Sequence, residues 1–212
     1  MEENMTEQFD SIIFDVDGTL WDSTELVAEA YNQTFEQEGV DVHVTADVIR
    51  SLCGKPMDAF FDHLLPNESS ERKAMLGEKA IETENALLEQ KSPVYYPEVK
   101  ETMEKLAKKV PLFIVSNCQK GYIELVLKWA DLGPVVQDYL CFGDTGTSKG
   151  QTILTLMKRN NLKKSIYVGD IQGDADACRE AGIPIIYCKY GFGTIEEPYA
   201  VISEFKELDA MF

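Results

Sequence analysis

The sequence predicts an α/β fold, with a Rossmann-like parallel sheet core, helices on both of its faces, and an inserted all-helical domain. Short apolar runs at 11–14, 111–115 and 165–168 have the length and composition of buried strands. Helical patterns separate the strands after residue 97, as expected for parallel strands joined by crossover helices. Residues 21–90 show no strand pattern, so the insert is expected to be all helical.

The first strand, Ser11–Phe14, is followed by a helical pattern that Gly39 ends. Breaks rich in glycine and proline then divide the next part of the chain into short segments. The predicted helices of this part cover 45–52, 57–65 and 70–90. Tyr31, Phe35, Phe60 and Phe61 are expected to form the core of this insert rather than a substrate wall.

The second half of the chain alternates between helices and strands, which assigns it to the same sheet as the first strand. We predict a core domain of residues 1–20 and 93–212 and a helical domain of residues 21–92. The expected elements are a helix around 99–110, a strand at 111–115, a helix at 123–130, a strand near 139–142, a helix at 152–158, a strand at 165–168, a helix at 172–181, a strand at 183–187, and a last strand and helix within 196–212.

Composition limits the classes of partner. The formal net charge of −17 over 212 residues argues against nucleic acid and anionic membranes as partners. No apolar run approaches the roughly 18 residues of a membrane span. The five scattered cysteines and the acidic, polar N-terminus predict reduced thiols in a cytoplasmic protein.

Two carboxylates follow the first strand in the stretch Asp15-Val16-Asp17-Gly18-Thr19. Gly18 permits a sharp turn, which presents backbone N–H groups as an anion-binding nest. The stretch does not fit an EF-hand loop, because the glycine stands at position 4 instead of 6. Taken alone, it is equally consistent with an ordinary turn.

Other polar residues stand where later strands end or helices begin. Ser116 and Asn117 follow one strand, Asp170 and Asp174 follow another, and Lys149 opens a helix. Each has an ordinary interpretation as a cap, turn or surface residue. A lysine at a helix N-terminus opposes the helix dipole, unless an anion lies nearby. Because ligands bind at the carboxyl ends of parallel strands, the whole set predicts one site.

Converging carboxylates repel one another unless they are protonated or bridged by a cation. An all-oxygen set with room for water and phosphate suits Mg²⁺. Ser116, Lys149 and backbone N–H groups would hold the remaining phosphate oxygens. These groups fit phosphoryl transfer, in which a carboxylate can act as the nucleophile.

The same residues, in this order and spacing, resemble the four motifs of the haloacid dehalogenase superfamily. The helical insert resembles its C1 cap, as in the phosphoglycolate phosphatase and β-phosphoglucomutase branch. The resemblance covers nearly the whole chain. One departure is visible: many relatives carry proline after the lysine of the third motif, whereas Gly150 follows Lys149 here.

The resemblance implies a role for each matching residue. Asp15 would be the nucleophile that becomes phosphorylated, and Asp17 the general acid and then the base. The implied metal ligands are Asp15, Asp170, the Asp17 carbonyl and, directly or indirectly, Asp174. The groups implied to position the phosphoryl group are Gly18 through its turn, Thr19, Ser116, Asn117 and Lys149.

These expectations describe a Mg²⁺-dependent phosphatase of a small phosphorylated metabolite. A phosphomutase would use the same core, and a phospho-aspartate signalling protein would keep the phosphoryl group without turnover. The seventy-residue insert and the spare acid Asp17 favour turnover. Substrate choice is expected to depend on the insert, where Lys55 is either a contact for a second anionic group or a solvated turn residue. The sequence specifies neither the substrate nor the oligomeric state.

Overall fold

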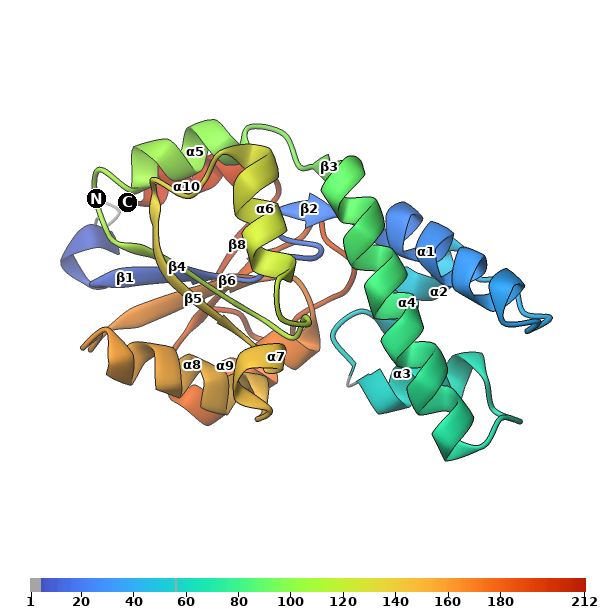
Figure 1. The fold of residues 1–212 in the computed structure, drawn as a ribbon. Helices are drawn as coiled ribbons and strands as arrows, with labels where there is room; N and C mark the ends of the chain where they lie inside the picture. The colour runs from blue at the N-terminus through green and yellow to red at the C-terminus, as the bar shows by residue number, and fades with distance from the viewer. Residues whose placement is uncertain (1–4, 56) are drawn as a thin grey trace. The chain divides into compact units, whose positions relative to one another are not determined.

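The computed structural model describes residues 5–55 and 57–212, and Figure 1 shows its fold. The chain divides into two compact units. The first unit runs up to Trp21 and resumes at Tyr95, and the second unit comprises Asp22–Val94. The chain passes between them through two short strands, β2 (Trp21–Asp22) and β3 (Val94–Tyr95), which pair with each other.

The first unit is built on a six-stranded sheet in the order β5-β4-β1-β6-β7-β8, and its neighbouring strands pair in parallel. This sheet confirms the predicted α/β fold class. Four of its strands are buried along their whole length, as expected where helices cover both faces. The strands are β1 (Ser11–Phe14), β4 (Leu112–Ser116), β5 (Val136–Cys141), β6 (Ser165–Gly169), β7 (Ile185–Cys188) and β8 (Ala200–Ile202).

Helices cover the two faces of this sheet. Figure 1 shows α5, α6 and α10 on one face and α8 and α9 on the other. The helical elements of this unit are η1 (Met5–Glu7), α5 (Val99–Leu106), α6 (Tyr122–Ala130), α7 (Phe142–Thr145), α8 (Lys149–Arg159), α9 (Gln172–Ala181), η2 (Phe205–Glu207) and α10 (Leu208–Met211).

Strand β1 lies inside the sheet, and its register determines which residues meet at the sheet edge. Phe14 pairs with Ile114 of β4 on one side and with Val168 of β6 on the other. The residues that follow these three strands therefore emerge side by side. The chain builds outward from β1 to β4 and β5, then returns to its other side with β6. This reversal makes the carboxyl end of β1 a topological switch point, where ligands bind in open α/β sheets.

The second unit consists of helices around an aromatic core. They are α1 (Thr24–Gln37), α2 (Ala46–Leu52), α3 (Met57–Leu64) and α4 (Ser70–Gln90). The ring of Tyr31 stacks on that of Phe61, with centroids 5.6 Å apart. Phe35 and Phe60 are buried in the same cluster. The prediction that these four aromatics form the core of the insert is confirmed.

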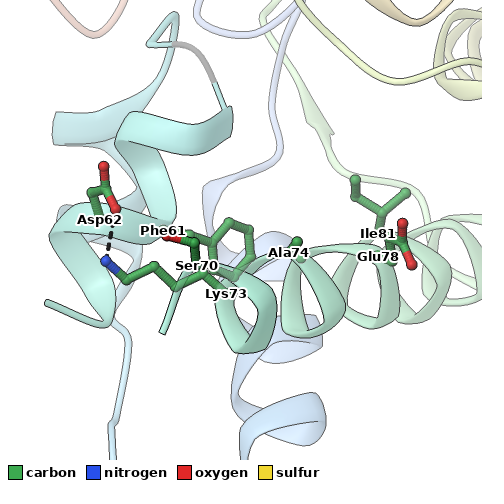
Figure 2. Close-up of a pocket in the computed structure, with 8 residues that line it drawn as sticks. Phe61, Asp62, Ser70, Lys73, Ala74, Glu78 and Ile81 are labelled. Atoms are coloured by element: carbon green, nitrogen blue, oxygen red, sulfur yellow. Dashed lines mark hydrogen bonds and ion pairs between the residues drawn. The ribbon is translucent and has the colours of Figure 1, made fainter. Parts of the chain in front are cut away.

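A surface pocket of about 480 Å³ lies within the second unit, along α3 and α4 (Figure 2). Phe61 lies against Gly77, where a Cβ would come within 3.1 Å of the ring. Lys73 pairs with Asp62 at the pocket wall, at 2.7 Å. Gly77 leaves room for the Phe61 ring between the two helices. We therefore attribute the pocket to the way in which α3 packs on α4.

Several boundaries differ from the sequence prediction. Helix α8 begins at Lys149, as expected from the lysine that opens it, although its apolar pattern covers only 152–158; β5 begins at Val136 rather than at 139. The start of β5 was missed because it is an edge strand with polar exposed residues, so it lacks an apolar run. The expectation of no strand in 21–90 is wrong at β2, and β3 and α7 were also not predicted. These elements are too short to show a period.

Two expectations from composition can be compared with the structure. The five cysteines are free thiols. None of the helices described at 5–55 and 57–212 combines the length and apolar composition that crossing a bilayer requires.

Candidate active site

Asp15 follows β1 directly and is buried, with 5% of its surface exposed. The turn after it depends on Gly18, whose φ of +81° is in the left-handed region. A Cβ at this position would lie 2.1 Å from Oδ2 of Asp170. Glycine is therefore required both by the backbone conformation and by the approach of Asp170 from the neighbouring strand.

Three carboxylates gather at this sheet edge, and we call Asp15, Asp170 and Asp174 the acidic cluster. Each offers an oxygen within 4.8 Å of the others, and all three residues are buried. Asp170 follows β6, and Asp174 lies in the first turn of α9. The parallel pairing of β1 with β6 brings Asp170 to Asp15, and the short loop between β6 and α9 adds Asp174.

Lys149 compensates part of this charge. Its Nζ donates to Oδ1 of Asp15 at 2.8 Å and to Oδ1 of Asp174 at 2.5 Å. The Ser148 hydroxyl caps α8 by accepting from the Gln151 N–H, so the cation stands at the first position of the helix. A positive charge at this position interacts unfavourably with the helix dipole. The negative charges of the two carboxylates compensate for this unfavourable interaction.

Asp174 also organises the loop after β6. Its Oδ2 accepts from the backbone N–H groups of Asp170 and Ile171, at 3.1 and 3.2 Å. Its other oxygen accepts from Lys149. Both oxygens therefore bind groups of the protein, and the carboxylate joins α8 to the loop that carries Asp170.

Burial and crowding shift the protonation of these groups. Burial raises the pKa of Asp15 to about 7, with Asp174 adding to the shift and Lys149 opposing it. Burial, then the charges of Asp174 and Asp15, raise the pKa of Asp170 to about 8. Burial disfavours the charge on Lys149, yet Asp15 and Asp174 together raise its pKa above the usual range.

The acidic cluster fits a divalent cation of the Mg²⁺ type. Its donors are carboxylate oxygens, which hard cations prefer. Burial is the main cause of the raised pKa values of Asp15 and Asp170, and neighbouring carboxylates add to it, so a bound cation would favour the charged form of both groups. Asp15 and Asp170 directly follow neighbouring strands and are suited to contact the ion, whereas Asp174 accepts three hydrogen bonds from the protein, one of them from the Lys149 cation.

Asp170 is fixed by three further contacts. The Phe192 N–H donates to its Oδ2 at 2.7 Å, and the Thr19 hydroxyl donates to its Oδ1 at 3.4 Å. Gly191 packs directly on it, since a Cβ there would lie 2.3 Å from the Cβ of Asp170. The loop after β7 thus holds this carboxylate against the turn after β1.

Asp17 lies outside the acidic cluster, although it is only two residues from Asp15. Its Oδ1 accepts from the Trp21 indole N–H at 2.9 Å and from the Tyr122 hydroxyl at 2.7 Å. Its charge contributes to raising the pKa of Asp15, so the two carboxylates are near neighbours.

The remaining predicted residues fall into two groups. Thr19 and Ser116 are buried in the first unit, and the half-buried Asn117 follows Ser116 at the end of β4. The structure thus brings them to the same sheet edge as Asp15. Lys55 belongs to the second unit, where it is exposed in the turn after α2. The neighbouring Pro56, part of the same predicted loop, lies outside the described residues.

Sequence reasoning missed four contributors to this site: Trp21, Tyr122, Gly191 and Phe192. Gly191, Phe192 and Gly193 form a short glycine-containing motif. Its position after an apolar strand could have indicated a loop at the same sheet edge. Trp21 and Tyr122, the aromatic donors to Asp17, stand at no sequence spacing from Asp17 that would indicate this role.

Comparison with known proteins places the chain among characterised families. Residues 12–188 match the model of the haloacid dehalogenase-like hydrolases. A phosphoglycolate phosphatase of Photorhabdus laumondii is 26% identical over 93% of this chain and 90% of its own length. The phosphoglycolate phosphatase of Aquifex aeolicus is 27% identical over 85% of each chain. A haloacid dehalogenase-like family protein of Streptococcus pneumoniae has the same fold, with a TM-score of 0.84 and 22% identity, covering 96% of this chain and 98% of its own.

Proposed function

Because the chain belongs to the haloacid dehalogenase-like hydrolases, we propose that it is a Mg²⁺-dependent phosphatase of a small phosphorylated metabolite. The observation that carries this proposal is the buried Asp15 carboxylate at the switch point. There it meets Lys149 and the other two carboxylates of the acidic cluster. This arrangement provides a nucleophile, a fixed cation and metal ligands at one strand end.

In the first step, an Asp15 carboxylate oxygen attacks phosphorus and displaces the ester oxygen. Asp17 donates a proton to that oxygen, so that an alcohol leaves and an aspartyl phosphate remains. In the second step, Asp17 takes a proton from water, which attacks the phosphoryl group. Inorganic phosphate leaves and the Asp15 carboxylate is restored.

The other groups of the site bind and orient the phosphoryl group. Lys149, the Ser116 hydroxyl, Thr19 and Asn117 would offer donors around Asp15. The Gly18 N–H already donates to the Trp21 carbonyl, at 2.9 Å, so Gly18 would contribute through the shape of its turn. Asp15, Asp170 and the Asp17 carbonyl would hold Mg²⁺, which neutralises charge on the phosphoryl oxygens. Asp174 acts indirectly, by holding Lys149 and the Asp170 loop.

Phosphoglycolate is the first substrate to test, because the relatives named above are phosphoglycolate phosphatases. Lys55 is our candidate contact for a second anionic group of the substrate. The support for it is its charge and exposure in the glycine-containing turn after α2.

The experiment measures phosphate release from phosphoglycolate and a panel of phosphorylated metabolites, with and without Mg²⁺. We expect Mg²⁺-dependent release by the wild type and none by Asp15→Asn. Asp10→Asn makes the same substitution at the opposite end of β1 and should keep wild-type activity. Circular dichroism and thermal unfolding check that all three proteins are folded.

Three results would contradict the proposal. A folded wild type that releases phosphate from no compound is not a general phosphatase. Isomerisation of a sugar phosphate without net release would indicate a phosphomutase. A stable phospho-aspartate without turnover would indicate a signalling protein.

A further inference from the structure

The surroundings of the Asp17 carboxylate suggest how its orientation is set. Two hydrogen-bond donors meet on one oxygen, Oδ1. They are the Trp21 indole N–H at 2.9 Å and the Tyr122 hydroxyl at 2.7 Å. They come from different elements, β2 and the first residue of α6. Two donors that approach from different directions restrict rotation of the carboxylate about its Cβ–Cγ bond.

Both donors are themselves immobilised by packing. Trp21 is fully buried and Tyr122 is 2% exposed. Their rings meet edge to face, with centroids 5.4 Å apart. Tyr95 packs against Trp21, also at 5.4 Å, and its hydroxyl donates to the Val126 carbonyl of α6 at 2.6 Å. We call Trp21 and Tyr122 the aromatic clamp.

We propose that Trp21 and Tyr122 are positioning residues of the reaction, which hold the Asp17 carboxylate in the orientation that proton transfer requires. The inference rests on the proposed function, in which Asp17 serves the leaving oxygen and then the attacking water. A proton donor contributes to catalysis only while it points at the reacting atom. Tyr95 lies beside these two residues, where its ring packs on Trp21 and its hydroxyl bonds to a backbone carbonyl of α6.

The test uses two small substrates that differ in their need for a proton on the leaving group. Phosphoglycolate releases an alkoxide-type oxygen, which needs a proton. Acetyl phosphate releases acetate, which leaves without one. The value of kcat/KM reports the steps up to release of the first product. We therefore compare kcat/KM for phosphoglycolate with kcat/KM for acetyl phosphate. Their ratio measures how much protonation of the leaving group by Asp17 accelerates the reaction.

We expect Tyr122→Phe to lower this ratio by about tenfold, a part of the roughly 10²–10⁴-fold that a positioned acid–base group contributes. Trp21→Phe, which removes the other donor, should lower the ratio as well. The double variant should lower it at least as far as either single change. Thermal unfolding identifies any variant that has lost its fold.

Tyr95→Phe is the matched control, since it removes one hydroxyl from a ring beside the clamp, and this hydroxyl bonds to a backbone carbonyl. It should lower the thermal midpoint about as much as Tyr122→Phe and leave the ratio at the wild-type value. A folded Tyr122→Phe and a folded double variant with unchanged ratios would overturn the positioning role. A raised ratio would overturn it too. If phosphoglycolate is not cleaved, the best phosphate monoester of the metabolite panel replaces it in the ratio. A wild type that cleaves neither acetyl phosphate nor any compound of the panel would overturn both this inference and the proposed phosphatase.

Discussion

The Lys149 ammonium lies between the carboxylates of Asp15 and Asp174, and only 7% of the residue is exposed. Replacing both partners of a buried ion pair with apolar residues often changes the stability of a protein little. Removing only one partner is costly, because it leaves a buried charge without compensation. At this site the remaining charges would be carboxylates that already bind protons more tightly than usual.

We predict that Lys149→Met lowers the free energy of unfolding by about 3 kcal/mol near pH 8 in the absence of divalent ions. Near pH 5.5 the loss should be smaller, because Asp15 and Asp170 then take up protons and less charge remains to compensate. Urea denaturation at both pH values measures the difference.

Lys109→Met provides the control for the lysine substitution. Lys109 pairs with Asp209 at the surface, at 2.7 Å. Its loss should cost less than about 1 kcal/mol, with little dependence on pH in this range. Equal losses for both variants at both pH values would contradict the compensating role of Lys149.

At the residue scale, sequence could indicate the acids and the lysine of this site, because they stand next to strand ends or helix starts. It could not indicate the groups that orient them. Tyr122 reaches Asp17 only because α6 packs beside the turn after β1, and Phe192 reaches Asp170 only through the loop after β7. Such contacts depend on the tertiary arrangement and leave no local pattern.

Helix α8 presents Lys149 to the acidic cluster, and its first turn depends on Ser148. The Ser148 hydroxyl accepts from the Gln151 N–H and bonds to the Glu180 carboxylate of α9. The apolar pattern of this helix begins only at 152, because the first turn follows a cap rather than an apolar period. The short element α7 was missed for a related reason, because none of its residues is buried.

We predict that Ser148→Ala destabilises the protein by about 1 kcal/mol and also lowers the rate of phosphate release several-fold. The second effect is expected because the first turn of α8 sets the position of Lys149. Ser69→Ala removes the equivalent cap of α4, where the hydroxyl accepts from the Arg72 N–H.

The two cap variants should lose similar stability, measured by urea denaturation, but Ser69→Ala should keep its activity. If Ser148→Ala releases phosphate at the wild-type rate despite the expected loss of stability, the cap does not position Lys149.

At the scale of the whole molecule, the raised pKa values make stability depend on pH. Asp15 and Asp170 bind protons more tightly in the folded chain than their ordinary value of 3.8 implies for the unfolded chain. Between about pH 4 and pH 8 the folded state therefore holds more protons, and the free energy of unfolding falls as pH rises. Lys149 does not alter the pH dependence in this range, because the stabilisation that its charge provides is lost only above pH 10.5.

We predict that the protein in EDTA loses a few kcal/mol of unfolding free energy, on the order of that expected from such shifts, between about pH 5.5 and pH 8.5. Asp170→Asn should flatten this dependence, and millimolar Mg²⁺ should stabilise the wild type most at the alkaline end. Urea denaturation across the range measures both effects.

Asp176→Asn serves as the control for the pH series. The pKa of this exposed carboxyl is lowered, chiefly by the Gln172 side chain and also by Arg179, so it titrates below the range measured. The variant should keep the wild-type slope. A wild-type stability that does not change with pH would contradict the protonation of the acidic cluster.

The fold class could be predicted from the alternation of strands and helices, but the order of the strands could not. That order depends on which distant segments pair, and the local patterns of β4 and β6 do not distinguish the two sides of β1. The site residues could still be predicted to share one edge, because the carboxyl ends of parallel strands lie at the same edge of a sheet; the strand order then decides which of them are neighbours.

The pairing of β2 with β3 bears on how such a protein can be altered. The excursion through Asp22–Val94 starts and finishes on neighbouring strands, so its two ends are already joined by the sheet. Closing a loop costs only about 0.6 kcal/mol more for each doubling of its length. The segment can therefore be lengthened, shortened or exchanged, in evolution or by design, with little change in the free energy of unfolding of the first unit. Under the proposed function, such changes would let substrate recognition diversify while the residues at the carboxyl end of β1 stay the same.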